Sequence, residues 1–183
     1  MAADRGEGPG ATARGRWVVG DLIWGPLAVG SLLGVVGLIG LVAGQPWLFP
    51  SLGPTAFLQA EGPDKPSARF YNTVVGHLVG LAAGIAAVSV LGAASAPSVM
   101  ATQVLAPVRV GAAVLAAALT MVGLSLLRAS HPPAAATMLL VALGGLEPTW
   151  RASGAVAIGA VILATLGEGV RYVRREIVTS PPR

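Results

Sequence analysis

Residues 22–60 read LIWGPLAVGSLLGVVGLIGLVAGQPWLFPSLGPTAFLQA and contain no acidic or basic side chain. A transmembrane helix needs about 20 mainly apolar residues to cross the hydrocarbon core of a bilayer. This run is too long for one such helix, so it contains a helix and a further apolar segment. A second long uncharged run covers residues 70–108, and shorter ones cover 110–127, 129–146 and 152–167. The pattern predicts a chain that crosses a membrane several times.

The composition excludes a water-soluble globular domain. Hydrophobic residues make up 54% of the 183 residues and charged residues 11%, and the mean hydropathy is +0.74. Soluble domains carry about 25% charged residues, so this chain cannot cover its whole surface with polar groups. The net charge of +4 comes mainly from arginines near the two ends, which is typical of membrane topology rather than of nucleic-acid binding. The absence of cysteine excludes disulfides and thiolate metal sites.

Four segments have the length and composition of transmembrane helices. They cover about residues 22–43, 73–91, 108–127 and 151–170. The first is longer than the core of a signal peptide and no A-x-A cleavage site follows it, so we expect it to be retained. The predicted fold is all-α, a polytopic membrane bundle of four transmembrane helices.

Two further apolar segments are broken by proline and glycine and are too short to span a membrane. Residues 47–60 contain two prolines and a glycine. A helix over residues 132–143 would rise about 18 Å, which crosses only part of a hydrocarbon core about 30 Å thick. We expect both segments to re-enter the membrane or to lie flat on its surface.

Polar and basic segments flank the apolar part of the chain. We predict a disordered cytoplasmic tail over residues 1–21, a transmembrane domain over 22–171 and a basic cytoplasmic tail over 172–183. The abundance of alanine, glycine and arginine suggests a bacterial source, so the expected location is the bacterial inner membrane.

The positions of the basic residues predict an orientation. With four spans and a cytoplasmic N-terminus, Arg109 shares the inside with both tails. Residues 61–69, Arg128 and Arg151 then lie outside. Lysine and arginine are more frequent inside in this arrangement, as the positive-inside rule requires. We therefore expect both termini in the cytoplasm.

The two halves of the transmembrane domain, about residues 22–94 and 105–171, resemble each other. The matching stretches are residues 25–30 with 106–111 and residues 51–56 with 130–135. Each half reads as a helix, a broken segment and a helix. Paired broken segments at matching positions indicate the binding site of a transporter, and the alternative is chance similarity in a chain rich in alanine and glycine.

The most distinctive motif is His131-Pro132-Pro133. The start of a helix exposes unpaired N–H groups and carries about half a positive charge. Irregular backbone at membrane depth is tolerated only where it is buried in protein or lines a cavity. A short helix from Pro132 would therefore direct its positive end into the protein, and the start near Pro54 would face the same place. Two converging helix starts would form an anion site; alternatively, His131 only caps the segment in an outer loop.

A second histidine lies inside a predicted membrane helix. His77 either contributes to an anion pathway or bonds to a neighbouring helix, because ionisable groups in membrane helices usually face the interior of the bundle. We expect a substrate site without a metal or a cofactor. The candidate substrate-binding residues are Ser51, Gly53, Thr55, Asn72, His77, Ser130, His131, Pro132 and Pro133.

Small residues at four-residue spacing favour close helix packing. Gly30 and Gly34 form one such pair, and Gly76 and Gly80 form another. Four helices enclose little volume, so we expect a homo-oligomer in the lipid bilayer.

Two other features have simple structural explanations. Glu168 and Arg171 are spaced for an intrahelical ion pair. Arg109 and Arg128 flank one predicted helix and are expected to extend their charges to the membrane surface.

Around His131-Pro132-Pro133, with Ser130 before it and residues 134–137 after it, the chain resembles the HPP family of small integral membrane proteins. The resemblance also takes in residues 51–56 and 72–77, and it covers about residues 22–171. It implies four transmembrane segments, and for some cyanobacterial and chloroplast members it implies nitrite transport.

Three functional hypotheses follow. The first is an integral membrane transport protein for a small inorganic anion, possibly nitrite. The second is a non-transporting membrane scaffold or accessory subunit, which the small size and the glycine pairs favour. The third, a membrane-embedded enzyme, is the weakest, because the sequence lacks H-E-x-x-H, G-x-S-x-G and P-loop motifs.

Overall fold

The computed structural model describes the backbone of residues 10–177 and the side chains of residues 22–176. Within that part of the chain the elements are seven α-helices and two 3-10 turns, without a strand, which confirms the all-α prediction. The helices are α1 (Gly10–Ala43), α2 (Leu52–Glu61), α3 (Phe70–Val90), α4 (Val99–Thr102), α5 (Pro107–Leu126), α6 (Ala134–Ala142) and α7 (Trp150–Ile177), and the turns are η1 (Pro66–Ala68) and η2 (Ala93–Ser95).

Four helices are long and apolar enough to cross a membrane, as the sequence predicts. These stretches are Leu22–Ala43, Phe70–Val90, Pro107–Leu126 and Trp150–Glu176. Their outer faces carry large exposed apolar side chains, among them Val42, Val114 and Leu126. Such a surface is costly in water and suits contact with lipid.

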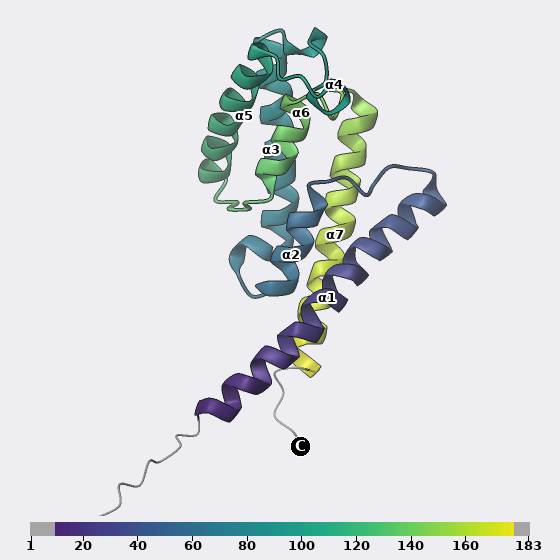
Figure 1. Cartoon of the computed structure of the whole chain (residues 1–183), viewed down its shortest axis with the longest axis vertical. Coiled ribbons are helices and arrows are strands. Elements are labelled where there is room, and N and C mark those ends of the chain that lie inside the picture. Colours follow the sequence, from purple (N-terminus) through teal and green to yellow (C-terminus); the bar gives the residue numbers. More distant parts are fainter. Residues whose placement is uncertain (1–9, 178–183) are drawn as a thin grey trace, which may run out of the picture.

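The first and last helices extend into the predicted tails. α1 begins at Gly10 and α7 ends at Ile177, so helix replaces the expected irregular backbone over residues 10–21. The rest of the two predicted tails, residues 1–9 and 178–183, lies outside the described residues. The start of α1 and the end of α7 lie at the same end of the molecule (Figure 1), which we call the C-terminal end of the bundle.

Proline and glycine set the ends of several helices. Pro107 opens α5 at the first helical position, where a missing N–H costs nothing. α1 ends before Gly44 at a φ of 63°, and α6 is followed by Gly144 at a φ of 77°. Both glycines adopt the left-handed conformation that side chains with a Cβ disfavour.

The two short segments lie inside the bundle rather than flat on its surface. Leu52 and Ala56 of α2 and Ala134 and Val141 of α6 have almost no exposed surface. α2 runs toward the C-terminal end of the bundle and α6 runs toward the opposite end, so their first turns meet near the middle (Figure 1). Of the two predicted arrangements, the burial of both segments within the bundle fits re-entrant helices and does not fit helices that lie flat on the membrane surface.

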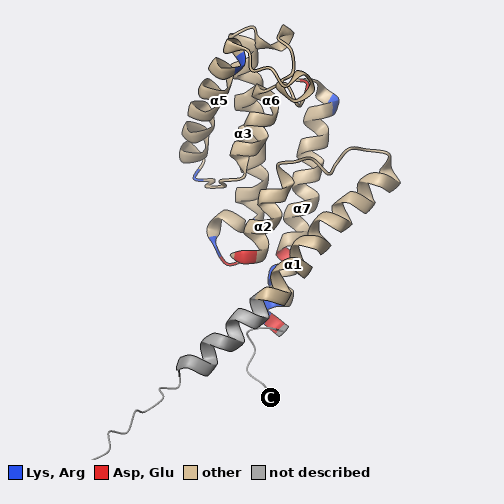
Figure 2. Ribbon diagram, in the orientation of Figure 1, with Lys and Arg blue, Asp and Glu red and all other residues tan. Residues whose placement is uncertain are grey.

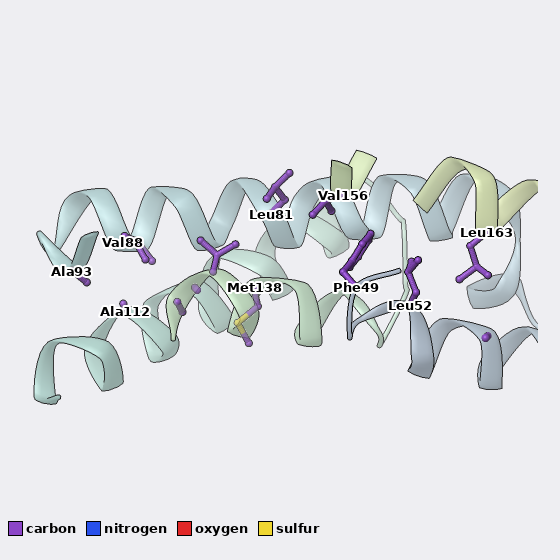
Figure 3. Packing of buried hydrophobic residues seen from close by; sticks show 14 of the residues in the cluster. Phe49, Leu52, Leu81, Val88, Ala93, Ala112, Met138, Val156 and Leu163 are labelled. Atoms are coloured by element: carbon purple, nitrogen blue, oxygen red, sulfur yellow. The ribbon is translucent and has the colours of Figure 1, made fainter. Parts of the chain in front are cut away.

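A line of buried apolar side chains holds α6 and α2 against the long helices. Figure 3 shows this line along α3, from Ala93 past Met138 to Leu52 and Leu163. Its members come from both halves of the sequence. Small side chains such as Ala112 let the helices approach closely, which suits a bundle whose association in lipid depends on packing.

The loop of residues 61–69 lies at the C-terminal end of the bundle, beside the end of α7. Arg175 pairs with Asp64, and Arg174 Nη1 donates to the carbonyl oxygen of Ala60 over 2.8 Å. The prediction that this loop lies across the membrane from the C-terminal tail is therefore wrong. The reason is that α2 turns back toward the end where α1 begins (Figure 2).

Arg109 lies at the other end of the bundle and is buried. Its guanidinium donates to the carbonyl oxygens of Ala96 at 2.7 Å, Ala142 at 3.2 Å and Pro97 at 3.4 Å. Both the predicted placement of Arg109 beside the tails and its expected extension to the membrane surface are therefore wrong. Instead it donates to carbonyl groups at the end of α6 and in the loop between η2 and α4. Arg128, by contrast, is exposed.

Candidate functional site

Five polar side chains meet where α2, α3 and α6 come together. They are Ser51, Thr55, His77, Thr137 and His131, and none has solvent-exposed surface. Ser51 precedes α2, His131 lies three residues before α6, and Thr137 is in the first half of α6. Buried polar groups require hydrogen-bond partners, and these five side chains provide them largely to one another.

Thr55 links the two histidines. Its hydroxyl oxygen lies 2.9 Å from His77 Nε2 and 3.3 Å from His131 Nε2, and it also contacts the Ser51 carbonyl oxygen at 3.2 Å. The two imidazole centroids are 5.0 Å apart with the rings inclined at 64°. His131 Nδ1 lies 2.8 Å from the carbonyl oxygen of Ser67, which anchors the ring from η1.

Thr137 joins the other side of His77 to the start of α2. Its hydroxyl oxygen lies 2.6 Å from His77 Nδ1 and 2.8 Å from Ser51 Oγ. Phe49 covers the His77 ring edge-on, with centroids 6.2 Å apart. The cluster is therefore continuous from Ser51 through both rings to Ser67.

Two glycines of α3 allow α6 and its leading loop to approach this closely. A Cβ at Gly76 would lie 2.5 Å from His131 Cβ, and one at Gly80 would lie 2.5 Å from the Ala134 carbonyl oxygen. Both distances are far shorter than a normal contact. The predicted Gly76–Gly80 pair thus serves packing within the chain and positions His131.

The structure brings together four of the predicted site residues, namely Ser51, Thr55, His77 and His131. The other five lie around this cluster. Asn72 donates from Nδ2 to the Ser130 carbonyl oxygen over 3.0 Å, which fixes the loop before His131. Pro133 is buried, whereas Ser130 and Pro132 are exposed and Gly53 is half-buried.

Sequence reasoning missed Thr137 and Ser67. Thr137 carried a usable signal, because it is the only polar side chain between Pro132 and Leu146. Ser67 carried none, since its contribution is a backbone carbonyl. The predicted pair of Glu168 and Arg171 is present, and Glu168 also accepts a hydrogen bond from the Phe70 backbone N–H at 3.0 Å.

A groove between α5 and α6 leads to His131. Its volume is about 540 Å³, and Met121, Leu124, Arg128 and Pro132 are among the residues that line it. The walls are mainly apolar, and Arg128 adds a positive charge. The groove therefore ends beside the histidine cluster, and the His131 side chain itself is fully buried.

The electrostatics of the cluster suit an anion better than a cation. The partners of the two rings are hydroxyls and one carbonyl, and none is acidic. The first turns of α2 and α6 add the partial positive charge of helix starts. Among the described side chains, no group of three histidine, cysteine or acidic residues could hold a metal ion.

The four apolar spans and the buried re-entrant helices define a multi-pass helical membrane protein. The family model described as "HPP, transmembrane region" matches residues 15–177. The chain belongs to this family, as the resemblance around His131-Pro132-Pro133 predicts. No curated protein and no solved structure matches the chain.

Proposed function

We propose that this protein transports a small inorganic anion across the membrane, with nitrite as the first substrate to test. The observation that carries the proposal is the meeting of two re-entrant helix starts at a buried histidine–hydroxyl cluster. Ser51 Oγ, just before α2, lies 2.8 Å from Thr137 Oγ1 of α6. In secondary transporters, the positive ends of discontinuous helices face anionic groups in this way.

The chemistry of the cluster supports a small substrate. His131, Ser51 and Thr55 offer imidazole and hydroxyl donors beside the backbone N–H groups of the two helix starts. All three side chains are fully buried and closely packed. The 3.3 Å contact between Thr55 and His131 is the longest link in the cluster, so an ion of a few atoms enters most easily there. Nitrite is favoured because some family members transport it.

The proposed orientation places both termini in the cytoplasm of a bacterial cell. Basic side chains at the C-terminal end of the bundle outnumber those at the opposite end among residues 22–176. The first group is Lys65, Arg69, Arg171, Arg174 and Arg175, and the second is Arg109 and Arg151. With both termini in the cytoplasm, the end that is richer in basic side chains is the cytoplasmic one, as the positive-inside rule requires. The loop of residues 61–69 now adds to the cytoplasmic charge, whereas the sequence-based placement put it outside.

Uptake by proteoliposomes tests the proposal directly. Purified protein is reconstituted, and entry of nitrite, nitrate, formate and chloride is measured with and without a pH gradient. Protein-free vesicles correct for leakage. We expect selective uptake of at least one anion. No uptake of any of them by vesicles that contain folded protein would refute transport of this class of substrate.

Two substitutions at His131 assign its role. His131→Ala should lower uptake by about tenfold or more, which corresponds to about 1.4 kcal/mol of lost interaction. His131→Gln keeps a donor and should retain more activity. Thr165→Ala is the control, because that side chain is exposed on α7 and bonds only to its own helix at Val161. Unchanged uptake in both His131 variants would remove this residue from the site.

A second candidate function is that of a non-transporting scaffold or accessory subunit. Gly30 and Gly34 lie on α1 with nothing within 4 Å of the position a Cβ would take. Their open face would allow close contact with another membrane helix, and a second copy of this chain is the proposed occupant. A single subunit mass in mild detergent would contradict the homo-oligomer. An unrelated partner in a pull-down, together with absent uptake, would favour the accessory role.

An enzymatic role receives the least support. Thr137 and His77 form a close hydroxyl–imidazole pair, but both are fully buried. The other nitrogen of His77 faces Thr55 rather than a carboxylate that would orient a base. We therefore propose a protein without catalytic activity.

A further inference from the structure

The carbonyl oxygen of Ser67 fixes the direction of hydrogen bonding at one end of the cluster. A carbonyl oxygen only accepts, so His131 carries a hydrogen on Nδ1 to make the 2.8 Å contact. In a neutral His131 the other nitrogen, Nε2, then has a lone pair. This nitrogen faces the hydroxyl of Thr55 at 3.3 Å and can accept its hydrogen, for which the Ser51 carbonyl oxygen at 3.2 Å is the other acceptor.

The same reasoning continues through His77 to Ser51. Thr55 has one hydroxyl hydrogen, so its 2.9 Å contact with His77 requires a hydrogen on His77 Nε2. Neutral His77 then accepts at Nδ1 from the Thr137 hydroxyl, 2.6 Å away. The 2.8 Å contact between the Thr137 and Ser51 hydroxyls can run in either direction, and when the Thr137 hydrogen points to His77 it is Ser51 that donates. The single hydrogen of Thr55 is shared between His131 Nε2 and the Ser51 carbonyl oxygen at 3.2 Å, and in either case the two neutral histidines hold opposite tautomers.

One added proton reverses the chain without moving a heavy atom. If His131 carries hydrogens on both nitrogens, its Nε2–H donates to Thr55 and Thr55 donates to His77 Nε2. His77 then donates from Nδ1 to Thr137, and Thr137 donates to Ser51. Between the two arrangements one hydrogen shifts across each link, so a proton taken up at Ser51 appears as an added hydrogen on His131 Nε2. Chains of histidine and hydroxyl groups that behave in this way are proton relays.

We infer that Ser51, Thr137, His77, Thr55 and His131 form a proton relay that couples transport of the anion to transport of a proton. The inference rests on the proposed anion site. An anion beside the starts of α2 and α6 stabilises a positively charged His131. By thermodynamic linkage, a proton on the relay raises the affinity for the anion by the same factor. Proton and anion then cross together with no net charge.

The charged side chains around the two rings do not contact the ring nitrogens, so we assign the carrying of the proton to the two histidines. Arg128, in the loop after α5, lines the groove that ends at His131. Glu61 at the end of α2 lines a second groove beside Pro132 and Pro133. On α7, Glu168 is held by Arg171 and by the backbone of Phe70. The ring nitrogens themselves contact only hydroxyls and a carbonyl.

Two more buried polar side chains lie beyond the relay. Gln59 follows Thr55 by one turn of α2, and Thr73 precedes His77 by one turn of α3, so each shares a helix face with a relay residue. Both are almost fully buried, and their polar side-chain atoms have no protein partner among the described residues. Gln59 packs against Gly167 near the C-terminal end of the bundle. These groups extend the polar line toward the proposed cytoplasmic side.

Histidine tautomers provide a test that does not require transport. The chain contains two histidines, so protein labelled isotopically in histidine, purified with a histidine-free tag, gives signals from two rings in nitrogen NMR. With both rings neutral, the relay requires one Nδ1–H ring and one Nε2–H ring. Two rings in the same tautomer would overturn the relay.

Coupled transport provides the second test. In vesicles with a pH gradient, electroneutral symport of one proton with each anion predicts accumulation that rises about tenfold per pH unit. Thr137→Val keeps the shape of the side chain but removes the hydroxyl between His77 and Ser51. This variant should lose gradient-driven accumulation by about tenfold, and Thr137→Ser, which keeps the hydroxyl, should retain it. Thr165→Val on the outer face of α7 should behave like the unaltered protein.

The outcomes separate the relay from the proposed function. No anion uptake under any condition would refute the proposed transport and its coupling together. Uptake that ignores the pH gradient would refute only the relay. Full gradient-driven accumulation in Thr137→Val would also refute the relay, and so would loss of accumulation in Thr137→Ser, which keeps the hydroxyl.

Discussion

Substitution of Gly76 by alanine tests how closely α3 must approach His131. The added Cβ would lie 2.5 Å from His131 Cβ and 3.0 Å from its Cγ and Cδ2. Carbon atoms in good contact are about 3.5–4.0 Å apart. His131 and α3 must therefore separate by about 1 Å.

This separation should affect function more than stability. Overpacking costs about 1–3 kcal/mol, and alanine recovers about 1 kcal/mol of helix propensity over glycine, so the net destabilisation is at most about 2 kcal/mol. The His131–Thr55 contact is already 3.3 Å long, so a displacement of His131 by about 1 Å would disturb it. Misplacement on this scale can lower a reaction rate by about 100-fold, so we expect at least a tenfold loss of anion uptake.

The assay compares Gly76→Ala with Gly169→Ala. Gly169 is exposed on α7, and nothing lies within 4 Å of its missing Cβ. Both variants are reconstituted after size-exclusion chromatography confirms folded protein, and thermal unfolding in detergent is recorded in parallel. Gly169→Ala should match the unaltered protein in uptake. If Gly76→Ala also matched it in both uptake and thermal stability, the close approach of α3 to His131 would have no role.

Three further outcomes follow from the structure. Arg109→Met removes the donor from three carbonyl groups, and a hydrogen bond to a charged group contributes about 1.5–3 kcal/mol. This variant should lower the thermal unfolding temperature far more than Arg151→Met, which changes an exposed side chain. Equal shifts would contradict a stabilising role for the buried Arg109. Because the chain has no cysteine, an impermeant maleimide should label Glu147→Cys on intact cells and Lys65→Cys only after permeabilisation, whereas labelling of both from one side would contradict the fold. Asn72→Ala loses the bond to the Ser130 carbonyl and should lower the free energy of unfolding by about 1 kcal/mol, which chemical denaturation in detergent can measure.

Much of the architecture could be predicted from local properties of the chain. Hydropathy and charge act on each segment separately, so the four spans and the two short segments could be located without knowledge of their neighbours. The direction of the short segments could not. α2 returns toward the C-terminal end because its residues pack against α1 and α7, and this decides where Asp64 and Lys65 emerge.

Part of the candidate site could also be predicted from local properties of the chain. His131 and Ser51 lie beside prolines that predict helix starts. The unpaired backbone groups of such a start cannot face lipid, so the start must face the interior of the protein. Thr137 has no such marker beyond its polarity in an apolar helix. Its importance depends on lying 2.6 Å from His77, which is a property of how α6 packs on α3.

The sequence by itself determined that this protein belongs in a membrane and that two short helices lie between its membrane-spanning helices. It also determined that His131 lies just before one of these short helices. These are consequences of composition and of backbone preferences within a few residues. Only the tertiary structure decided which polar groups meet. Ser51 and Thr137 are 86 positions apart, and they come into contact because the small face of α3 at Gly76 and Gly80 lets α6 pack close to its backbone. Such a contact depends on shape across helices, which the local pattern of a sequence does not contain.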